Sequence, residues 1–426
     1  MPSFIVEGGA PLQGTIRPAG NKNAALPAIA ATLLTGAPVT LENVPRIQDV
    51  ETLLEIVGSL GATVQWVGTN EVTVDASAVT SGRPDPRLSE RIRASILLAG
   101  PLLARFGEVS LPPPGGDVIG RRRLDTHFLA LTALGGEVQL QDGFRLRATG
   151  LKGARVFLDE PSVTGTENAV MAAVLARGCS RIENAAAEPH VQDLCLLLNA
   201  MGARIQGIGT QTLEIEGVPA LGGARFRIGA DHIEAGSFIG LAVVTGSDLE
   251  IMDAPVEHLD STLLGFRRLG VEVEVLGENR LKVWGSREAV IRQDAFGHVP
   301  KVDDGPWPAF PADLTSIALV TATRCRGTVL IHEKMFESRM FFTDKLVGMG
   351  ANIILCDPHR AVVVGPSPLR GGSVDSPDIR AGMALLIAAL GAEGRSRIHN
   401  IGQIERGYER VDERLRALGA RIQREG

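Results

Sequence analysis

Aromatic residues are scarce in this chain, which has one tyrosine, three tryptophans and 13 phenylalanines among 426 residues. So few rings leave little surface on which nucleic-acid bases could stack, and a net charge of −6 gives no general attraction for a polyanion. Both features argue against a nucleic-acid-binding protein. Any site for anions must be a local concentration of arginine and lysine.

Cysteine is scarce as well, and its four positions, Cys179, Cys195, Cys325 and Cys356, lie far apart without CxxC spacing. This spacing predicts neither a disulfide framework nor a zinc site, and the eight histidines form no cluster with metal-ligand spacing. We therefore expect no metal and no other cofactor.

Long apolar runs are missing, since no stretch approaches the roughly 18 residues of a membrane-spanning helix. The first residues, MPSFIVEGGAPLQG, lack the basic and apolar regions of a signal peptide. We expect a cytoplasmic protein with no membrane, no nucleic acid and no obligate protein partner. The length exceeds that of one ordinary hydrophobic core, so two domains are expected.

A short phrase that recurs six times is the strongest pattern in the sequence. Its copies are LGATV at 60, LGGEV at 134, MGARI at 201, LGVEV at 269, MGANI at 349 and LGARI at 418. The glycines of successive copies are 74, 67, 68, 80 and 69 residues apart. Six repeats of about 70 residues therefore fill the chain.

Each repeat shows the same alternation of helix and strand signals. An Ala-rich segment such as AALPAIAATLL predicts a buried helix, whereas three- and four-residue apolar spacing, as in YERVDERLRALG, predicts a half-exposed one. Short alternating runs such as TLEIEG predict strands. The expected repeat is a strand, a buried helix, a strand, a surface helix and two more strands.

The repeats divide into two groups of three. The sixth copy reaches Gly426 without its final strand, and SFIVEG near the start has the missing pattern. We expect one domain of residues 22–229 and another of residues 1–21 with 230–426, completed by the N-terminal strand. Three equivalent repeats would bury their Ala-rich helices together and cover them with sheets.

Charged residues interrupt the apolar pattern where the expected helices begin. A cation at a helix N-terminus opposes the helix dipole and is a poor cap, so it indicates a bound anion. The cations in such positions are Lys22, Arg93, Arg122, Arg339, Arg380 and Arg406. Three other polar residues are better explained as helix caps or surface ion-pair partners, namely Ser95, Asp49 and Asp231.

Six motifs carry a resemblance that spans the chain. They are AGNKNAALPAIAATLLT, RASILLAGPLLARFG, GGDVIGRRRLDTHF, ENAAAEPHVQDLCLLLNAMGA, FPADLTS and DIRAGMALLIAALGAEG. In this order they resemble the UDP-N-acetylglucosamine 1-carboxyvinyltransferases, enolpyruvyl transferases with an EPSP synthase-like fold. The resemblance implies an α/β fold of two inverted prism domains, each of three repeats, with a cleft between them. It also implies enolpyruvyl transfer from phosphoenolpyruvate to the 3-hydroxyl of UDP-N-acetylglucosamine, the first committed step of peptidoglycan synthesis.

The resemblance assigns roles to individual residues. The phosphoenolpyruvate-binding set is Lys22, Asn23, Arg122, Arg339 and Arg406. The UDP-N-acetylglucosamine-binding set is Asn23, Arg93, Arg122, Arg123, Leu124, Asp125, Thr126, His127, Ser162, Val163, Asp313 and Met335. Asp378 and Arg380 support the phosphoenolpyruvate end. The implied catalytic residues are Lys22, Asp117 and Asp313, with Asp313 as the general base for the 3-hydroxyl.

Asp117 stands where the family has its general acid, a position that most members fill with cysteine. It follows a Gly pair in the Pro-rich stretch SLPPPGGDVIGRRR, which resembles the family's lid loop. A carboxylic acid can supply a proton only when it is un-ionised, and a dry site that holds anions favours that form. Because Asp117 has no thiol for fosfomycin to alkylate, we expect the enzyme to be insensitive to this antibiotic.

Two departures from the family pattern keep other functions open. Glu160 stands where some members have lysine, and Arg123 stands where proline is common. The chain could therefore be a paralogue that acts on another nucleotide, or a catalytically silent relative that only binds a UDP-sugar. Transfer to 3-phosphoshikimate is disfavoured, because NKN replaces the SKS-type motif of that enzyme. A polynucleotide-binding function would rest on the three-arginine run alone.

Overall fold

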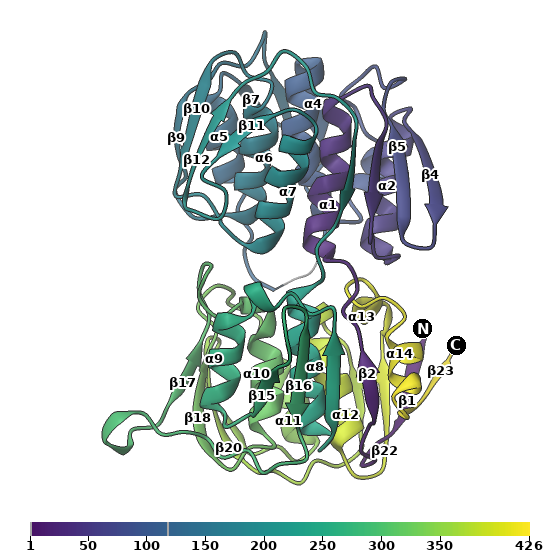
Figure 1. Cartoon of the computed structure of the whole chain (residues 1–426), viewed down its shortest axis with the longest axis vertical. Coiled ribbons are helices and arrows are strands. Elements are labelled where there is room, and N and C mark those ends of the chain that lie inside the picture. The colour runs from purple at the N-terminus through teal and green to yellow at the C-terminus, as the bar shows by residue number, and fades with distance from the viewer. Residues whose placement is uncertain (1, 117–118) are drawn as a thin grey trace. The chain divides into compact units, whose positions relative to one another are not determined.

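A computed structural model describes residues 2–116 and 119–426, which form two compact units (Figure 1). The first unit contains the residues up to Ala19, a short segment that ends at Arg121, and Ala230–Gly426. The second contains residues 20–116 and Arg122–Gly229. These units differ from the expected domains by residues 20 and 21 and by the segment that ends at Arg121.

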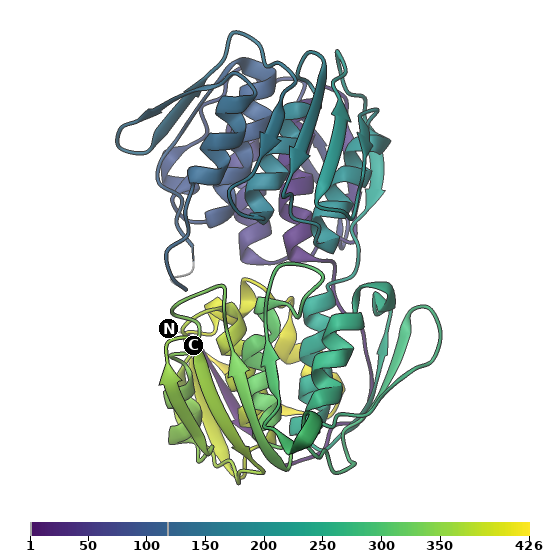
Figure 2. The same ribbon diagram turned by 90° about the vertical axis from the view of Figure 1, so that its left-hand side faces the viewer.

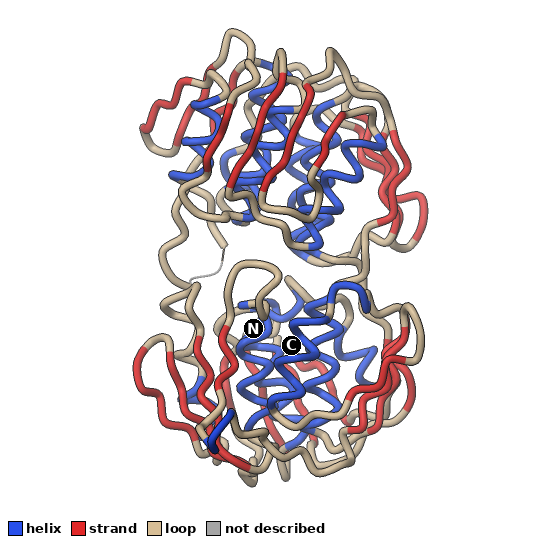
Figure 3. The backbone as a smooth tube through the Cα atoms, turned by 60° about the vertical axis from the view of Figure 1, so that its left-hand side comes forward, coloured by secondary structure: helices blue, strands red, loops and turns tan. Residues whose placement is uncertain are grey.

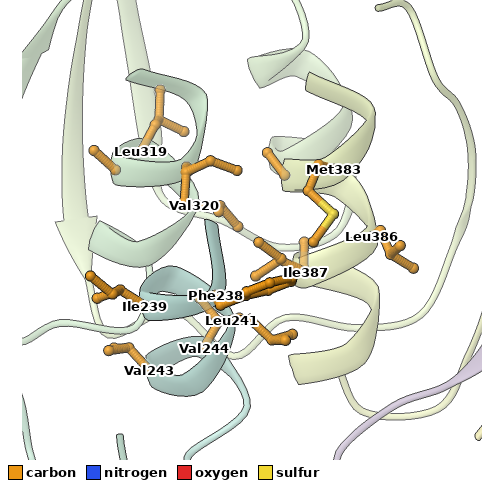
Figure 4. Close-up of a cluster of buried hydrophobic side chains, with 14 of the residues drawn as sticks. Phe238, Ile239, Leu241, Val243, Val244, Leu319, Val320, Met383, Leu386 and Ile387 are labelled. Atoms are coloured by element: carbon orange, nitrogen blue, oxygen red, sulfur yellow. The ribbon is translucent and has the colours of Figure 1, made fainter. Parts of the chain in front are cut away.

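Three apolar helices form the centre of the first unit. They are α8 (His232–Val244), α10 (Thr315–Ala322) and α12 (Ile379–Gly391), and each packs against the other two. Every residue of α8 and α10 is buried. A Cβ atom added to Gly240 of α8 would lie 2.6 Å from Ile317 of α10, so only glycine permits this close approach. Figure 4 shows Phe238, Leu319 and Met383 in the resulting core.

Three four-stranded sheets surround these helices, one for each repeat. The strands are β1 (Ser3–Glu7), β2 (Gly14–Ile16), β14 (Asp248–Met252), β15 (Val273–Val275), β16 (Arg280–Trp284), β17 (Lys301–Asp303), β18 (Gly327–His332), β19 (Ile353–Asp357), β20 (Arg360–Gly365), β21 (Ser373–Asp375), β22 (Arg395–His399) and β23 (Arg421–Glu425). Their orders are β15-β16-β14-β2, β17-β18-β20-β19 and β21-β22-β1-β23. Figure 2 and Figure 3 show strands lying outside the helices.

The first strand of the chain lies inside the last sheet. β1 pairs antiparallel with both β22 and β23, so that Phe4 lies opposite Ile398 on one side and Arg424 on the other. Phe4 and Val6 are fully buried. β1 thus supplies the strand that the sixth repeat does not carry in its own sequence.

The remaining helices of the first unit lie outside the central three. They are η3 (Val256–His258), α9 (Asp260–Arg268), η4 (Ala295–Gly297), η5 (Ala312–Leu314), α11 (Thr343–Gly348), α13 (Gly402–Glu405) and α14 (Val411–Ala417). In the described part of the chain, no helix combines the length and the apolar character needed to cross a membrane.

The second unit repeats this plan with its own core. Its helices are α1 (Lys22–Ala31), η1 (Thr32–Leu34), α2 (Gln48–Ser59), α3 (Pro86–Ser89), η2 (Arg93–Leu98), α4 (Ala99–Phe106), α5 (Asp125–Ala133), α6 (Val163–Ala173) and α7 (Pro189–Ala200). The turns of η2 lead directly into α4, which packs against α6, and α1 packs against η2. The buried helices α1, α4 and α6 therefore occupy the places that α8, α10 and α12 hold in the first unit.

Two sheets of the second unit have four strands and one has three. The strands are β3 (Val39–Glu42), β4 (Thr63–Gly68), β5 (Glu71–Asp75), β6 (Glu108–Leu111), β7 (Glu137–Leu140), β8 (Phe144–Arg147), β9 (Arg155–Phe157), β10 (Cys179–Glu183), β11 (Arg204–Gln206), β12 (Thr212–Glu216) and β13 (Ala224–Arg227). Their orders are β13-β3-β5-β4, β11-β12-β10-β9 and β6-β8-β7.

The α/β class expected from the sequence is confirmed, with one exception in the repeat pattern. Five repeats have the expected four strands, but the second repeat has only three among the described residues. Pro84 and Pro86 fall where its first strand was expected, and proline cannot donate a ladder hydrogen bond. The backbone nitrogen of Ser110 in β6 still donates to the oxygen of Gly82, at 3.2 Å.

The repeated phrase marks the same event in every repeat, the end of the surface helix. Its first residue is the C-cap of α2, α5, α7, α9, α11 or α14. The glycine that follows has a φ between 81° and 104° in all six copies. A side chain would be strained in this left-handed conformation, so glycine is the favoured residue. The period of about 70 residues therefore reflects the positions at which the six surface helices end.

The core of the first unit predicts a large difference between two Phe→Ala substitutions. Phe238 of α8 is fully buried, whereas Phe296 of η4 is 98% exposed. Phe238→Ala should lower the free energy of unfolding by about 3–5 kcal/mol because it leaves a cavity. Phe296→Ala should change it by less than about 0.5 kcal/mol. Guanidinium chloride unfolding of both variants measures this, and equal losses would contradict the assignment of the core.

Candidate active site

Lys22 is the first residue of α1, where it is buried beside an acid. Its Nζ lies 2.7 Å from Oδ2 of Asp49, and both side chains are less than one tenth exposed. Asp49 lies in the first turn of α2 without capping that helix. The sequence predicted a cap or a surface ion pair for Asp49, whereas the structure shows the buried partner of Lys22. A buried ammonium group requires such a carboxylate.

Asn21 and Asn23 flank this lysine at the start of α1. The Asn21 side chain caps the helix, since its Oδ1 accepts a hydrogen bond from the backbone nitrogen of Asn23 at 2.9 Å. Asn23 itself is half-buried. The cap therefore holds the N-terminal turn of α1 in a fixed geometry and leaves Lys22 at its first position, where it opposes the helix dipole.

Two of the three consecutive arginines before α5 are held by a fourth arginine. Arg93, the first residue of η2, donates from Nη2 to the backbone oxygens of Arg122, at 2.8 Å, and Arg123, at 3.3 Å. Burial, and then the charge of Arg122, lower the pKa of Arg93 to about 10, so it remains charged at neutral pH. The local concentration of positive charge that the sequence predicted is present here.

His127 lies buried in the first turn of α5. Its Nε2 lies 2.9 Å from Oγ1 of Thr164, and its Nδ1 has no hydrogen-bond partner among the residues that the structure describes. Burial, followed by the charge of Arg93, lowers the pKa of His127 to about 4. The imidazole is therefore neutral at pH 7.

The other residues predicted to bind the nucleotide lie at the starts of α5 and α6. Leu124 packs against the core at the N-cap position of α5, followed by Asp125, which is exposed, and Thr126, which is buried. Ser162 caps α6, because its Oγ accepts a hydrogen bond from the backbone nitrogen of Gly165 at 3.2 Å, and Val163 follows it. The contact between His127 and Thr164 joins the two helix starts.

In the first unit, Asp313 on η5 lies between two buried arginines. Its Oδ1 lies 3.0 Å from Nη1 of Arg339, and its Oδ2 lies 2.9 Å from Nη2 and 3.0 Å from Nε of Arg380. Burial alone would raise the pKa of Asp313, but the charges of Arg380 and Arg339 hold it far below its ordinary value. Asp313 is therefore an ionised carboxylate whose side chain is still 27% exposed.

Each of the two arginines has one buried N–H group that donates no hydrogen bond to a described residue. Nη1 of Arg380 and Nε of Arg339 have no hydrogen-bond partner among the residues described. Asp378 caps α12 and accepts from the backbone nitrogens of Arg380, at 2.8 Å, and Ala381, at 2.9 Å. Asp313 holds both guanidinium groups side by side, and the planar guanidinium suits a carboxylate or a phosphate.

Two further residues of this cluster were missed by the sequence analysis. Tyr408 is fully buried with its ring 5.4 Å from the guanidinium carbon of Arg380, and its hydroxyl lies 2.9 Å from Oγ of Ser237. Glu333 is fully buried with Oε2 3.9 Å from Nε of Arg339. Burial raises the pKa of Glu333 to about 9. An acid after the apolar strand TVLIH was the available signal for Glu333, whereas nothing distinguished Tyr408 from a core residue.

Arg406, Met335 and Asp117 complete the predicted set. Arg406, expected just before the surface helix of the last repeat, lies between α13 and α14: it is the C-cap of α13, where a cation complements the dipole, and its Nη1 donates to Oε1 of Gln403 at 2.8 Å. Met335 is 41% exposed, and its backbone nitrogen donates to Oδ2 of Asp304 at 3.3 Å. Asp117 lies outside the described residues.

Comparison with known proteins places this chain among enolpyruvyl transferases. The model of the EPSP synthase (3-phosphoshikimate 1-carboxyvinyltransferase) family matches residues 6–415. A UDP-N-acetylglucosamine 1-carboxyvinyltransferase of Bradyrhizobium diazoefficiens is 62% identical, covering 99% of this chain and 97% of the relative. Another protein of that name, from Treponema pallidum, is 56% identical over the full length of both chains.

Solved structures show the same fold. The enolpyruvyl transferase NikO from Streptomyces tendae superposes with a TM-score of 0.88 at 25% identity, covering 99% of this chain and 98% of its own. An EPSP synthase from Acinetobacter baumannii superposes with a TM-score of 0.76 at 16% identity over the full length of both chains. At 16% identity, the similarity to the EPSP synthase shows only that the two proteins share a fold.

The raised pKa of Glu333 predicts a pH-dependent loss of stability. Between the ordinary glutamate pKa and about 9, the folded protein keeps a proton on Glu333 that the unfolded chain releases. The contribution of Glu333 to the free energy of unfolding should therefore fall as the pH rises from 5 to 9. Glu333→Gln should remove that contribution and raise the denaturation midpoint at pH 7.5 and 9 relative to the wild type.

Denaturant unfolding at pH 5, 7.5 and 9 measures this effect. Glu278→Gln is the matched control, because Glu278 is an exposed glutamate. Its curve should follow the wild type at each pH. A Glu333→Gln variant whose stability also runs parallel to that of the wild type would show that Glu333 is ionised in the folded protein.

Proposed function

Since this chain belongs to the EPSP synthase family and, within it, to the UDP-N-acetylglucosamine 1-carboxyvinyltransferases, we propose that it transfers the enolpyruvyl group of phosphoenolpyruvate to the 3-hydroxyl of UDP-N-acetylglucosamine. Phosphate is the other product, and the reaction is the first committed step of peptidoglycan synthesis. The observation that carries the proposal is the Asp313 carboxylate held between the buried guanidinium groups of Arg339 and Arg380.

The chemistry requires an acid, a base and positive charge. The sugar 3-oxygen bonds to the carbon that carries the phosphate, while the methylene carbon gains a proton. Loss of that proton and of phosphate then restores the double bond. The phosphate monoester alone brings about −1.5 to −2 charges, and the carboxylate brings one more. Arg339, with Arg380 in support, provides charge for this substrate in the first unit.

Asp313 is the proposed base for the 3-hydroxyl. In the structure its charge is shared with Arg339 and Arg380, which makes it a weak base. An anionic substrate that binds the same guanidinium groups draws part of their charge away from Asp313. Its affinity for a proton then rises, so the base gains strength when phosphoenolpyruvate is bound.

The second unit supplies the remaining proposed contacts. Lys22, with its compact charge, and Arg122 bind the phosphoenolpyruvate, and Asn23 binds the sugar as well. The starts of α5 and α6 bind the nucleotide. We take the two compact units to be the two domains of the enzyme. Arg406 and Met335 keep their proposed roles in substrate binding.

Phosphate release from phosphoenolpyruvate tests the proposed function. Purified protein should release phosphate with UDP-N-acetylglucosamine as the acceptor and should release none with 3-phosphoshikimate or UMP. Asp313→Asn keeps the shape of the side chain but removes the base, and it should lower kcat by about 10²-fold or more. Turnover with another acceptor alone would identify a paralogue, and tight UDP-sugar binding without phosphate release would identify a silent relative.

Asp117 is the proposed general acid, and its identity predicts the response to fosfomycin. The wild-type enzyme should keep its activity after incubation with the antibiotic, because a carboxylate at this position offers no thiol. Asp117→Cys should become sensitive and carry a covalent adduct on residue 117 by mass spectrometry. Rapid inactivation of the wild type with an adduct on Asp117 would contradict this assignment.

A further inference from the structure

Asp159 lies in the loop between β9 and α6, and its carboxylate contacts two residues near the start of α5. Oδ1 accepts a hydrogen bond from Oγ1 of Thr126 at 2.6 Å, and Oδ2 accepts one from Nη2 of Arg123 at 3.0 Å. Thr126 is fully buried in the first turn of α5, and Arg123 is the last of the three consecutive arginines. One side chain therefore joins the basic run to the helix that follows it.

The two segments with proposed nucleotide contacts, residues 122–127 and 162–163, are cross-linked around Asp159. Oε1 of the neighbouring Glu160 lies 3.4 Å from the Thr126 hydroxyl. In the same turn of α5, Nε2 of His127 lies 2.9 Å from the Thr164 hydroxyl. The loop before α6 and the start of α5 thus form one hydrogen-bonded structure, in which Asp159 is the residue that also reaches the arginines.

The charges around Asp159 indicate what Arg123 does. Besides its bond to Asp159, Arg123 places Nε 3.3 Å from Oδ2 of Asp125. The hydrogen bond from Thr126 and the charge of Arg123, acting against burial, lower the pKa of Asp159, so it is ionised at neutral pH. Two carboxylates therefore balance the one charge of Arg123. An arginine paired in this way holds the loop in place.

The backbone at Arg122 is consequently held at two neighbouring points. Its backbone oxygen accepts a hydrogen bond from Arg93, and the side chain of its neighbour Arg123 is held by Asp159. The Arg123–Asp159 pair is partly exposed, with side chains 41% and 33% accessible, and pairs of this kind contribute little to folding stability. Asp159 can therefore be changed without loss of the fold.

We propose that Asp159 is a positioning residue for the sugar nucleotide, which holds Arg122 and His127 in their binding geometry through Arg123 and Thr126. The inference rests on the proposed function, from which it takes the nucleotide as ligand. If the loop is already ordered in the free protein, binding of the ligand carries a smaller entropic cost. Asp159 therefore acts on affinity for the nucleotide and has no part in the proton transfers.

Asp159→Asn tests this role because it removes the charge and retains an acceptor for Thr126. The Kd of UDP-N-acetylglucosamine, measured calorimetrically without phosphoenolpyruvate, should rise about tenfold, the loss expected for one charged hydrogen bond. The KM for the same substrate should rise in parallel, with kcat and the KM for phosphoenolpyruvate changing less than about twofold. Asp159→Glu, which restores the charge, should recover part of the affinity.

A double-mutant cycle with Arg123→Gln identifies the path of the effect. If Asp159 acts through Arg123, Asp159→Asn should cause no further loss of affinity in the Arg123→Gln background. The control is Glu183→Gln in β10, which removes a carboxylate that pairs with Arg155 and Arg181 in the same unit. Its Kd for the nucleotide should equal that of the wild type.

Three results would overturn the proposal: an unchanged Kd in Asp159→Asn, additive losses in the double mutant, or a fall in kcat with no change in nucleotide affinity. The calorimetric measurement also separates this inference from the proposed function. A wild-type protein that binds UDP-N-acetylglucosamine but releases no phosphate would overturn the proposed function alone. A wild-type protein that does not bind the nucleotide would overturn both.

Discussion

The site in the first unit depends on keeping two guanidinium groups charged away from water. Arg339 and Arg380 are buried, and the carboxylate of Asp313 lies within 3.0 Å of each. Removal of that carboxylate would leave two like charges with little solvent, an arrangement that costs several kcal/mol. The helix cap of Asp378, the ring of Tyr408 and the buried Glu333 all lie around this group. The surrounding structure thus maintains a carboxylate and two cations side by side.

The second unit also contains buried basic side chains, but different groups surround them. Lys22 has a buried carboxylate partner in Asp49, whereas Arg93 donates to backbone oxygens and has its pKa lowered by burial. His127 is buried in neutral form. These differences fit the proposed division of labour, in which strongly charged groups bind phosphoenolpyruvate and the helix starts bind a larger, less densely charged nucleotide.

The repeat and the class of fold could be predicted because both depend on local chemistry. A glycine is required wherever a surface helix ends in the left-handed conformation, so six helix ends leave six copies of one phrase. Apolar, Ala-rich segments mark the buried helices in the same way. The second repeat lacks one strand because prolines lie where that strand was expected. The spacing of the repeated phrase does not reveal this local feature.

The partners within the site could not be predicted in the same way. Cations at helix starts are visible in a sequence, and Lys22 and Arg380 were found by that signal. In the first unit the partners come from distant repeats: Asp313 reaches Arg380, and Tyr408 reaches Ser237 across 171 positions. The sequence pattern also did not show that a short helix ends at Arg406 before the surface helix of the last repeat begins. Pairings of this kind are set by tertiary packing.

The central claim is that Asp313 is a carboxylate restrained by two arginines and released as a base by an anionic substrate. The most direct test is a pH titration of its carboxyl carbon by NMR, in protein with ¹³C-labelled aspartate, with the signal assigned from the Asp313→Asn spectrum. In the free protein the signal should stay that of an ionised group to the lowest pH at which the fold survives. Addition of phosphoenolpyruvate should bring its titration to higher pH. An ordinary aspartate titration that phosphoenolpyruvate leaves unchanged would contradict the account.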